Sequence, residues 1–319
     1  MGESFKPYRI TGMAVDPIHV GTGGGRLGRV DQSIVRDPVT RVPKIPGSSL
    51  AGVYRAYAAM ANDKYPDCAG QGQPDKQGKG GHCGKRDCPI CTVFGFARST
   101  GGGFAGLAAF SDAQVLLFPV ATREGPLWIT CPGAMRLVDA EINGLSDKAV
   151  YRSTEGRPLN LGWLLLPVEK YPKDQDPQSK VNKLQIPEYI GQRLAVVSDK
   201  LFSHIVNGNL EVRTSVSINP ETGAAEEGAL FTYEALPRST VLLWEVICKN
   251  PAHFKVGDAA VSAVADLNSV FKVVEASHPY LECLGIGGMG TRGMGRLRVL
   301  SAKATSQQSV APRNQTGGA

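Results

Sequence analysis

Apolar residues recur along the chain with two different periods. Helical spacing, with apolar residues three and four positions apart, predicts helices at residues 50–61, 188–205 and 257–275. Alternation or short apolar runs predict strands at residues 8–20, 30–35, 110–120, 241–249 and 296–300. The order strand, helix, strand, repeated once, predicts an α+β fold with an antiparallel sheet of ferredoxin-like type and large insertions.

A further alternating pattern predicts a β-hairpin. Val212, Thr214, Val216 and Ile218 lead into the turn sequence Asn-Pro-Glu-Thr-Gly, and a second apolar stretch leads back. The outgoing arm carries polar residues on both faces. We therefore expect the hairpin, residues 211–234, to project from the core.

Three stretches lack a usable period. Residues 62–106 are polar and rich in Gly and Cys, and they are too long for an ordinary loop unless a metal organises them. Residues 121–187 are interrupted by prolines and charges, so no order of elements is predicted there. The Ser, Gln, Gly and Pro-rich tail, residues 302–319, is expected to be disordered. We predict one domain, residues 1–301, with the 62–106 and hairpin segments as insertions.

Composition excludes a disordered chain and predicts a soluble one. The protein has 319 residues, of which 42% are hydrophobic and 20% charged, enough to bury a sizeable core. No uninterrupted apolar run approaches the ~18 residues of a membrane span, and the first residues lack a signal-peptide pattern. We therefore expect a cytoplasmic protein without a membrane partner.

Glycine is the unusual component. There are 38 glycines, about 12% against a usual ~7%, and most fall in four clusters, at residues 21–28, 70–84, 95–106 and 285–295. Clustered glycine indicates loops where the backbone approaches another group closely. The net charge of +6 suggests that this group is anionic.

Four of the seven cysteines lie within 24 residues. Cys68, Cys83, Cys88 and Cys91 have spacings that can close a tetrahedral site, and Zn²⁺ accepts four thiolates without redox chemistry. Four protein ligands leave no open position for a substrate, so we expect a structural zinc. Two alternatives are that His82 replaces one cysteine and that the loop holds four free thiols.

Two glycine clusters contain the string G-x-G-x-x-G, but neither has the context of a nucleotide site. The first leads into an extended run and the second into the last strand, and no G-K-[ST] follows either. Both are rich in arginine, and residues 284–319 carry five basic residues and no acidic one. Glycine backbone and arginine side chains together favour binding of nucleic-acid phosphates. Two solvated basic loops are the alternative.

The start of the first predicted helix offers a second phosphate site. Ser48 and Ser49 precede the apolar stripe, with Lys44 and Arg55 nearby, and a helix N-terminus attracts anions. Helix capping explains the serines equally well. His19, at a strand end, contacts RNA or is a structural hydrogen-bonding residue. The residues expected to contact RNA are His19, Gly21, Arg26, Arg29, Lys44, Ser48, Ser49, Arg55, Gly288, Gly290, Arg292 and Arg296.

Several strings together resemble the RAMP superfamily of CRISPR proteins. They are Ile18-His19-Val20-Gly21 with its glycine-rich turn, Lys44 to Gly52, Phe110 to Val120, and Gly287 to Arg296. The chain looks most like the repeated backbone subunit of type III effector complexes. The string before Val120 is similar to the Cmr-type version, whereas the cysteine insertion is more similar to Csm-type relatives.

The resemblance implies an RRM-like core and an RNA-guided function. Copies of the subunit would form a filament along a CRISPR guide RNA together with other effector subunits. The hairpin would act as a thumb that flips one nucleotide out of the duplex between guide and target, at a cost of a few kcal/mol. The protein would then read backbone and shape while base pairing reads sequence.

The resemblance also implies endoribonuclease activity on the target RNA, with a divalent metal, Mg²⁺ or Mn²⁺. By position the required aspartate is Asp31, and Asp37 is its nearest competitor. Arg26, Arg29 and Arg36 flank Asp31 and should lower its pKa, so it is expected to be ionised. An ion pair with Arg29 or Arg36 is the structural alternative. A non-catalytic guide-binding subunit and a stand-alone guide-processing ribonuclease that uses His19 are the other functions considered.

Overall fold

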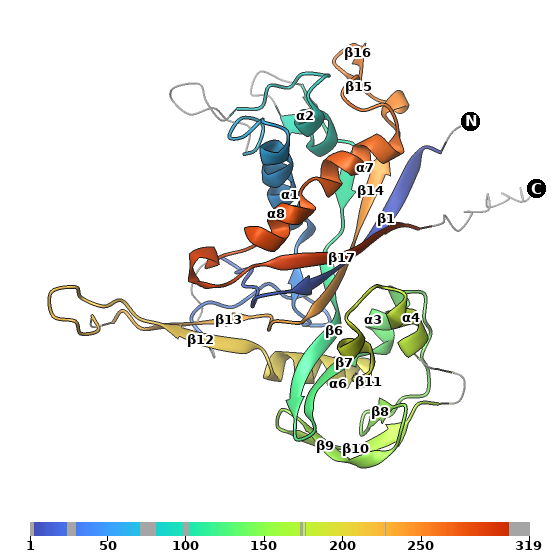
Figure 1. Cartoon of the computed structure of the whole chain (residues 1–319), viewed down its shortest axis with the longest axis vertical. Helices are drawn as coiled ribbons and strands as arrows, with labels where there is room; N and C mark the ends of the chain where they lie inside the picture. Colours follow the sequence, from blue (N-terminus) through green and yellow to red (C-terminus); the bar gives the residue numbers. More distant parts are fainter. Residues whose placement is uncertain are drawn as a thin grey trace, which may run out of the picture.

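A large mixed sheet runs through the whole protein. In this computed structural model the described residues are 3–23, 30–70, 81–97, 102–172, 175, 177–226 and 228–305. The sheet has eleven strands, nine of them in the order β17-β1-β14-β6-β7-β11-β8-β10-β9, with β2 beside β6 and β5 beside β14. Figure 1 shows an upper lobe, a lower lobe and a hairpin that projects between them. The fold is therefore mixed α/β with a large central sheet.

The upper half of the sheet is antiparallel. Strand β1 (Phe5–Ala14) lies between β14 (Val241–Lys249) and β17 (Leu297–Ala304), and β14 also pairs with β5 (Ala108–Phe110) and β6 (Ala113–Thr122). Strand β2 (Lys44–Ile45) pairs with the start of β6. The strand predicted at 241–249 is confirmed at both ends.

Close packing in this half depends on one glycine of β1. Gly12 lies opposite Leu242, and a Cβ at this position would come within 2.8 Å of the ring of Trp244. Trp244 is almost fully buried. A larger residue at position 12 would displace this indole ring from the core.

Three helices outside the cysteine insertion belong to this half of the sheet. Helix α1 (Gly47–Ala61) contacts α7 (Leu267–Glu275) and α8 (His278–Cys283), and α7 and α8 contact β14 and β17 (Figure 1). Leu50, Tyr54 and Ala58 recur every fourth residue on the buried face of α1, as predicted. The rings of Tyr8 and Phe271 stack with their centroids 3.8 Å apart, which joins α7 to β1.

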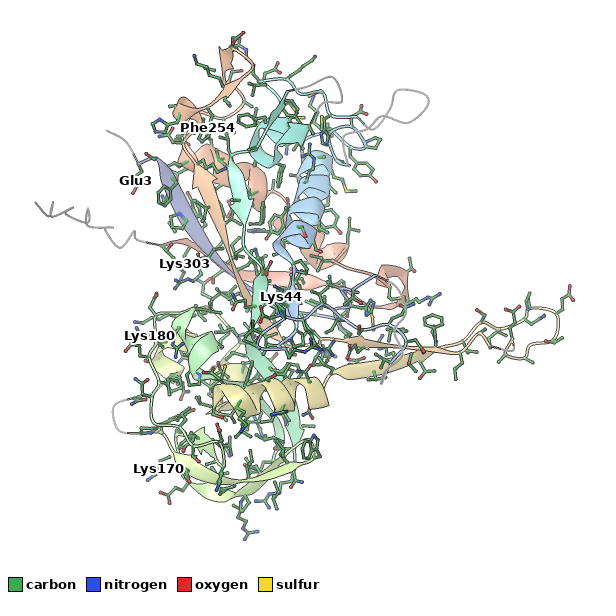
Figure 2. All side chains as sticks on the ribbon, turned by 180° about the vertical axis from the view of Figure 1, so that it is seen from behind. Glu3, Lys44, Lys170, Lys180, Phe254 and Lys303 are labelled. Atoms are coloured by element: carbon green, nitrogen blue, oxygen red, sulfur yellow. The ribbon has the colours of Figure 1, made fainter. Side chains whose placement is uncertain are left out.

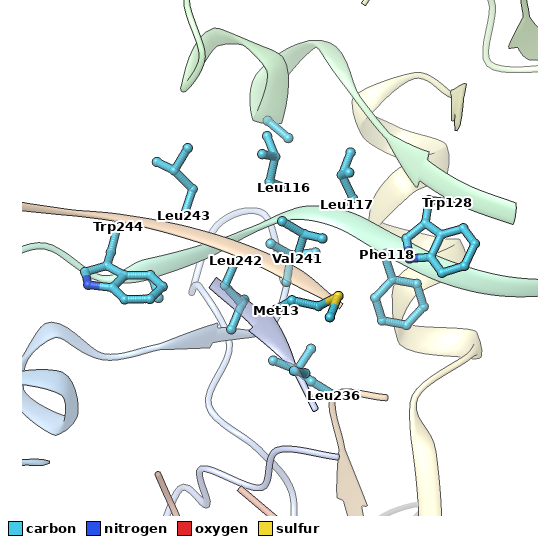
Figure 3. Packing of buried hydrophobic residues seen from close by; sticks show 14 of the residues in the cluster. Met13, Leu116, Leu117, Phe118, Trp128, Leu236, Val241, Leu242, Leu243 and Trp244 are labelled. Carbon is cyan, nitrogen blue, oxygen red and sulfur yellow. The ribbon is translucent and has the colours of Figure 1, made fainter. Parts of the chain in front are cut away.

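Strand β6 joins the two lobes. Its first half pairs with β14, with Leu117 opposite Val241, and its second half pairs with β7 (Gly125–Thr130), with Phe118 opposite Ile129. The run Val-Leu-Leu-Phe is buried on both faces, which explains why it is continuously apolar. Figure 3 shows these side chains beside those of β14 and Trp128.

The lower lobe is formed by the stretch for which the sequence predicted no order, residues 121–187, together with the segment predicted as one helix at 188–205. Its strands β8 (Val150–Arg152), β9 (Gly156–Leu161), β10 (Leu164–Lys170) and β11 (Leu194–Val196) extend the sheet. Its helices are α3 (Pro132–Arg136), α4 (Gln178–Asn182), α5 (Glu188–Gly191) and α6 (Asp199–Gly208).

The predicted hairpin is present, with β12 (Glu211–Ser215) paired to β13 (Phe231–Ala235). The insertion contains α2 (Pro89–Phe94), β3 (Phe96–Ala97) and β4 (Gly103–Phe104), and a small hairpin, β15 (Lys255–Val256) with β16 (Ala259–Ala260), precedes α7. Short 3-10 turns lie at Pro251–His253 and Gly290–Arg292. Of the described helices, none combines the length and the hydropathy needed for a transmembrane segment.

Several predicted elements differ from the structure: residues 30–35 form only isolated bridges rather than a strand, and the strand predicted at 110–120 is divided between β5 and β6. The helix predicted at 188–205 is interrupted by strand β11, and a new helix begins after Ser198, whose hydroxyl accepts a hydrogen bond from the backbone N–H of Leu201. The helix predicted at 257–275 begins only at Leu267, because Asp266 and Ser269 form a capping box there. The first strand ends at Ala14 rather than residue 20. The last strand continues to Ala304, so residues 302–304 are not part of a disordered tail, and 306–319 lie outside the described residues.

Candidate functional site

Strand β13 lies between the two terminal glycine-rich segments. Phe231 and Tyr233 pack against Met289 and Met294 of the C-terminal glycine segment. The alternate residues of the strand, Thr232 and Glu234, point to its other face. They bind residues 31–36, which follow the N-terminal glycine cluster at residues 21–28. The structure therefore brings residues 31–36 and the C-terminal glycine segment, residues 285–295, together at the root of the hairpin.

Asp31 is exposed and is held by a single residue of β13. Its Oδ2 accepts hydrogen bonds from the backbone N–H of Thr232 at 2.7 Å and from the Thr232 hydroxyl at 2.9 Å. These bonds, the backbone one first, lower the pKa of the Asp31 carboxyl below its ordinary value. Asp31 is therefore ionised at neutral pH.

The prediction that Arg36 lowers the pKa of Asp31 is wrong. Arg36 pairs with Glu234, with Nη2 2.7 Å from Oε2, and its Nε donates to Asn207. Arg26 and Arg29 lie outside the described residues. The competitor Asp37 caps its own turn, because Oδ1 accepts from the N–H groups of Val39 and Thr40.

His19 is buried beside the same strand. Its Nδ1 lies 2.6 Å from the carbonyl oxygen of Glu234, and its own carbonyl accepts from the N–H of Gly288 at 2.8 Å. The imidazole also meets the ring of Tyr233 edge-on. This position fits the structural role better than that of a general acid or base.

A pocket of about 410 Å³ opens between the two glycine segments. Residues from both ends of the chain contribute to its wall, among them Gln32 and Ser33, which directly follow Asp31. The described residues that line it include no Lys, Arg, Asp or Glu: His19, Gly21, Thr22, Gly23, Gln32, Ser33, Gly288 and Met289. The pocket thus offers backbone and polar groups, and two of its lining residues directly follow the ionised Asp31 in the chain.

The C-terminal glycines serve two purposes. Gly287 has φ +90°, and a Cβ there would clash with the carbonyl oxygen of His19, while Gly285 closely approaches the backbone of Gly295 and Gly295 that of Ile286. These glycines allow intramolecular packing. Around Gly290 and Gly293, by contrast, a Cβ would meet open space, so these two remain accessible to a ligand.

Most of the C-terminal basic residues have partners that the sequence did not indicate. Arg296 forms two hydrogen bonds with Asp16, at 2.5 and 3.0 Å, and Arg298 pairs with Glu282. Arg292 has no acidic partner among the described residues; its guanidinium lies over the ring of Phe231, and it donates to the hydroxyl of Ser215. Arg292 is therefore the basic residue of this segment best placed for a phosphate.

The predicted phosphate site at the start of α1 is already filled by a carboxylate. Asp112 Oδ1 accepts from the N–H of Gly47 at 2.8 Å, and Oδ2 pairs with Lys44 at 2.7 Å. Figure 2 places Lys44 where the two lobes meet. Ser48 and Ser49 lie in the first turn, the N-cap residue is Pro46, and it is Asp112 that accepts the first N–H group of the helix, so the capping explanation for the serines is also wrong.

Arg55 is buried rather than accessible to RNA. Its Nε donates to the carbonyl of Cys68 and its Nη1 to the carbonyl of Gly95, both at 2.6 Å. These bonds tie the beginning and the end of the cysteine insertion to α1. The prediction that Arg55 binds phosphate is not supported by this position.

The four cysteines of the insertion converge. Their sulfur atoms all lie within 4.8 Å of one another, with Cys68 3.5 Å from Cys91 and 3.9 Å from Cys88. Thiolates 2.3 Å from a tetrahedral zinc are about 3.8 Å apart. A hydrogen bond from the Cys91 thiol lowers the pKa of Cys88 below the ordinary value of a cysteine. The group can therefore hold a metal.

His82 is not one of the converging ligands. Its Nε2 lies 2.8 Å from the carbonyl of Gly70, and the metal-binding group found among the described residues consists of cysteines alone. Gly95 and Gly106, at the edge of the insertion, have positive φ and approach each other's backbone. These glycines allow the tight turns around the cysteine group.

Comparison with protein-family models assigns the chain to a family. The model of the RAMP superfamily matches residues 13–298, from β1 to β17. The chain belongs to the RAMP superfamily. The match includes His19, Asp31, the cysteine group, the hairpin and the C-terminal glycine segment.

Individual CRISPR proteins are similar to most or to part of the chain. The CRISPR system Cmr endoribonuclease Cmr4 of Pyrococcus furiosus is 26% identical over 95% of this chain and 98% of its own. The CRISPR system Cms endoribonuclease Csm3 of Methanothermobacter thermautotrophicus is 40% identical over a shorter region, 29% of this chain and 34% of its own.

Solved structures share the fold. A chain of the type III-B Cmr-beta complex in its apo state superposes with a TM-score of 0.61 over 94% of this chain and 97% of its own, at 16% identity. Oligomeric Cmr4 from Pyrococcus furiosus gives a TM-score of 0.57 over 95% of this chain and 100% of its own, at 21% identity. The predicted RAMP resemblance is confirmed.

Thr232 and Glu234 are site residues that sequence reasoning missed. Both were included in the hairpin as ordinary strand positions. The alternation of aromatic and polar residues in Phe-Thr-Tyr-Glu was the available signal, because it gives β13 one apolar and one polar face.

Proposed function

We propose that this RAMP protein is a Cmr-type backbone subunit of a type III CRISPR effector complex that binds guide RNA and cleaves the paired target RNA. The similarity to a Cmr endoribonuclease over 95% of the chain supports the family function. One observation carries the catalytic part: an ionised carboxylate, Asp31, is fixed at the hairpin root by Thr232, and the two residues that follow it in the chain, Gln32 and Ser33, line a pocket between the glycine segments.

The same proposal assigns roles to the parts of the fold. Residues 1–301 would form one RRM-like palm of ferredoxin-like topology, in agreement with the antiparallel order β17-β1-β14-β6 and with α1 and α7 between the strands. The hairpin would be the thumb. It exposes apolar side chains, a chemistry suited to insertion between bases: Val212, Val216, Ile218 and Leu230.

Asp31 would act on a target RNA bent at the thumb. A splayed nucleotide can place its 2′-OH in line with the adjacent phosphate, and such alignment alone is worth several kcal/mol. Asp31 would be the protein ligand for Mg²⁺ or Mn²⁺, which polarises a phosphate when bound. Among the described residues no second acidic side chain joins it in a metal-binding group, so phosphate and water would supply the other ligands.

Contacts to RNA would come from the accessible part of the glycine segments. Arg292, Gly290, Gly21 and the pocket wall are the described residues placed for this, and binding through phosphates should weaken with salt. Other copies of the subunit and further effector subunits would be its partners in the cytoplasm. The cysteine group would hold a structural Zn²⁺ that orders the insertion.

Replacing Asp31 tests the function directly. The variant D31A, assembled with guide RNA and the other subunits, should bind target RNA normally and lose cleavage at the positions served by this subunit. D37A is the matched control, since Asp37 is a nearby loop aspartate that caps its own turn, and it should cleave normally. Cleavage by D31A at the rate of the unmodified complex would favour a purely structural subunit. Loss of cleavage on chelation, restored by Mg²⁺ or Mn²⁺, would establish the metal.

A further inference from the structure

We propose that Thr232 is a positioning residue for Asp31, and that it couples the catalytic carboxylate to the hairpin. This inference rests on the proposed role of Asp31 in cleavage. It adds a residue from the other side of the site, 201 positions away in the chain.

Asp31 and Thr232 hydrogen-bond to each other in both directions, through their side chains and their backbone N–H groups. The Thr232 hydroxyl donates to Asp31 Oδ2 at 2.9 Å and accepts from the Asp31 backbone N–H at 3.2 Å, and the Thr232 backbone N–H donates to the same Oδ2 at 2.7 Å. Three hydrogen bonds thus fix the main chain and the carboxylate plane of Asp31. All of those to the carboxylate fall on Oδ2, which leaves Oδ1, as far as the described residues go, for a ligand.

The rest of this segment is fixed to the same strand. Gln32 donates its N–H to the carbonyl of Thr232, and Glu234 donates its N–H to the carbonyl of Gln32. The Glu234 carboxylate accepts from Ile34 N–H and pairs with Arg36. Residues 31–36 therefore follow β13 as an additional strand-like segment, and Thr232 is the position where this ladder reaches the carboxylate.

Coupling follows because β13 is one arm of the hairpin. Val212 and Thr214 of β12 lie opposite Glu234 and Thr232, and both arms continue outward from this root (Figure 1). RNA that presses on the hairpin acts on β13, and the hydrogen bonds of Thr232 transmit any shift to Asp31. A misplacement of about 1 Å in a reacting group can cost on the order of 100-fold in rate.

The chain provides a matched set of variants. T232V removes the hydroxyl with little change in volume, while T232S keeps the hydroxyl and removes the methyl group. T214V makes the same chemical change on the opposite arm, at the residue directly across from Thr232, which has no described contact with Asp31. Each variant is assembled into the full complex, and the single-turnover cleavage rate is measured separately from target affinity.

We expect T232V to cleave at least ~10-fold more slowly with target affinity unchanged within about 2-fold, because the loss concerns alignment rather than binding. T232S should recover to within about 3-fold of the unmodified rate, and T214V should be unaffected. If T232V does not assemble, T232A replaces it as the hydroxyl-free variant with the same expectation.

Three results would overturn the inference: full-rate cleavage by the hydroxyl-free variants, equal loss in T232S and T232V, or equal loss in T214V and T232V. The last would indicate a general disturbance of the hairpin. These outcomes are distinct from failure of the proposed function, which would appear as full-rate cleavage by D31A. If D31A is inactive and T232V and T232A are fully active, only the role of Thr232 is refuted.

Discussion

Arg36 and Glu234, 198 residues apart in the chain, form an ion pair of 2.7 Å in which the glutamate side chain is only 7% exposed. The other carboxylate oxygen of Glu234 accepts the N–H of Ile34. One buried side chain thus binds both a backbone N–H group and a guanidinium of residues 34–36, the segment that follows the N-terminal glycine cluster.

E234Q should therefore destabilise the protein. The substitution leaves the partly buried guanidinium of Arg36 without its countercharge, and we expect a loss of about 2 kcal/mol, below the full cost of a completely buried pair because Asn207 still binds Arg36. Urea unfolding measures the change. D139N is the control, since it breaks an Arg9 pair whose carboxylate is 71% exposed and should cost less than ~1 kcal/mol. Equal midpoints for E234Q and the unmodified protein would contradict the prediction.

Removal of the metal should loosen the insertion selectively. Elemental analysis is expected to find one zinc per chain, and C88S should lose it, because three thiolates cannot complete the tetrahedral group. Hydrogen exchange should then rise between residues 81 and 97, with little change in β14.

C283S is the control for this experiment, because Cys283 is an exposed cysteine of α8 outside the group. It should retain the zinc and the exchange pattern of the unmodified protein. Purified protein with negligible zinc and four freely titrating thiols in the insertion would exclude a structural metal.

His278 should make stability depend on pH. Burial against Tyr54 and Phe271 lowers the pKa of its imidazole to about 4, from an ordinary 6.5, because the charged form is desolvated. The unfolded chain binds this proton more readily, so the contribution is fully present above pH 6.5 and is lost as pH falls toward 4. The loss in unfolding free energy caused by this one imidazole amounts to about 3 kcal/mol between pH 6.5 and pH 4.

H278F keeps an aromatic ring at this position and cannot be protonated. The difference in unfolding free energy between H278F and the unmodified protein should therefore shift by up to about 3 kcal/mol in favour of H278F between pH 7 and pH 4. The other titrating groups are the same in both proteins, so their contributions cancel in this difference. A difference that is independent of pH would show that His278 is not buried in its neutral form.

Local patterns predicted the parts of the fold whose signals are short-range. Helix α1, strand β14, the hairpin and the cysteine group follow from periodicity and spacing, and each is present. The lower lobe was not predicted, since its strands are short and pair with distant partners. The break before α6 was missed because apolar residues keep helical spacing across a buried strand.

The site was predicted where it depends on adjacent residues and missed where it depends on long-range pairing. Excess positive charge after residue 284 indicated an anion site, yet Asp16, 280 residues from Arg296, neutralises part of it. Arg55 was expected to bind a phosphate near the start of a helix, although it is buried and bonded to the insertion. A linear sequence does not reveal which distant carbonyl or carboxylate will satisfy a basic side chain.

The hairpin divides into two parts with different bonding. Its root carries the contacts to Asp31 and Arg292, whereas the hydrogen bonds described for its outer part join hairpin residues to one another, as between Asn219 and Ala224 or Ser217 and Glu226. Residues could be gained or lost near the tip without moving the carboxylate. In the proposed function, the reach of the subunit along its RNA and the chemistry at each cleavage point could therefore change independently during evolution.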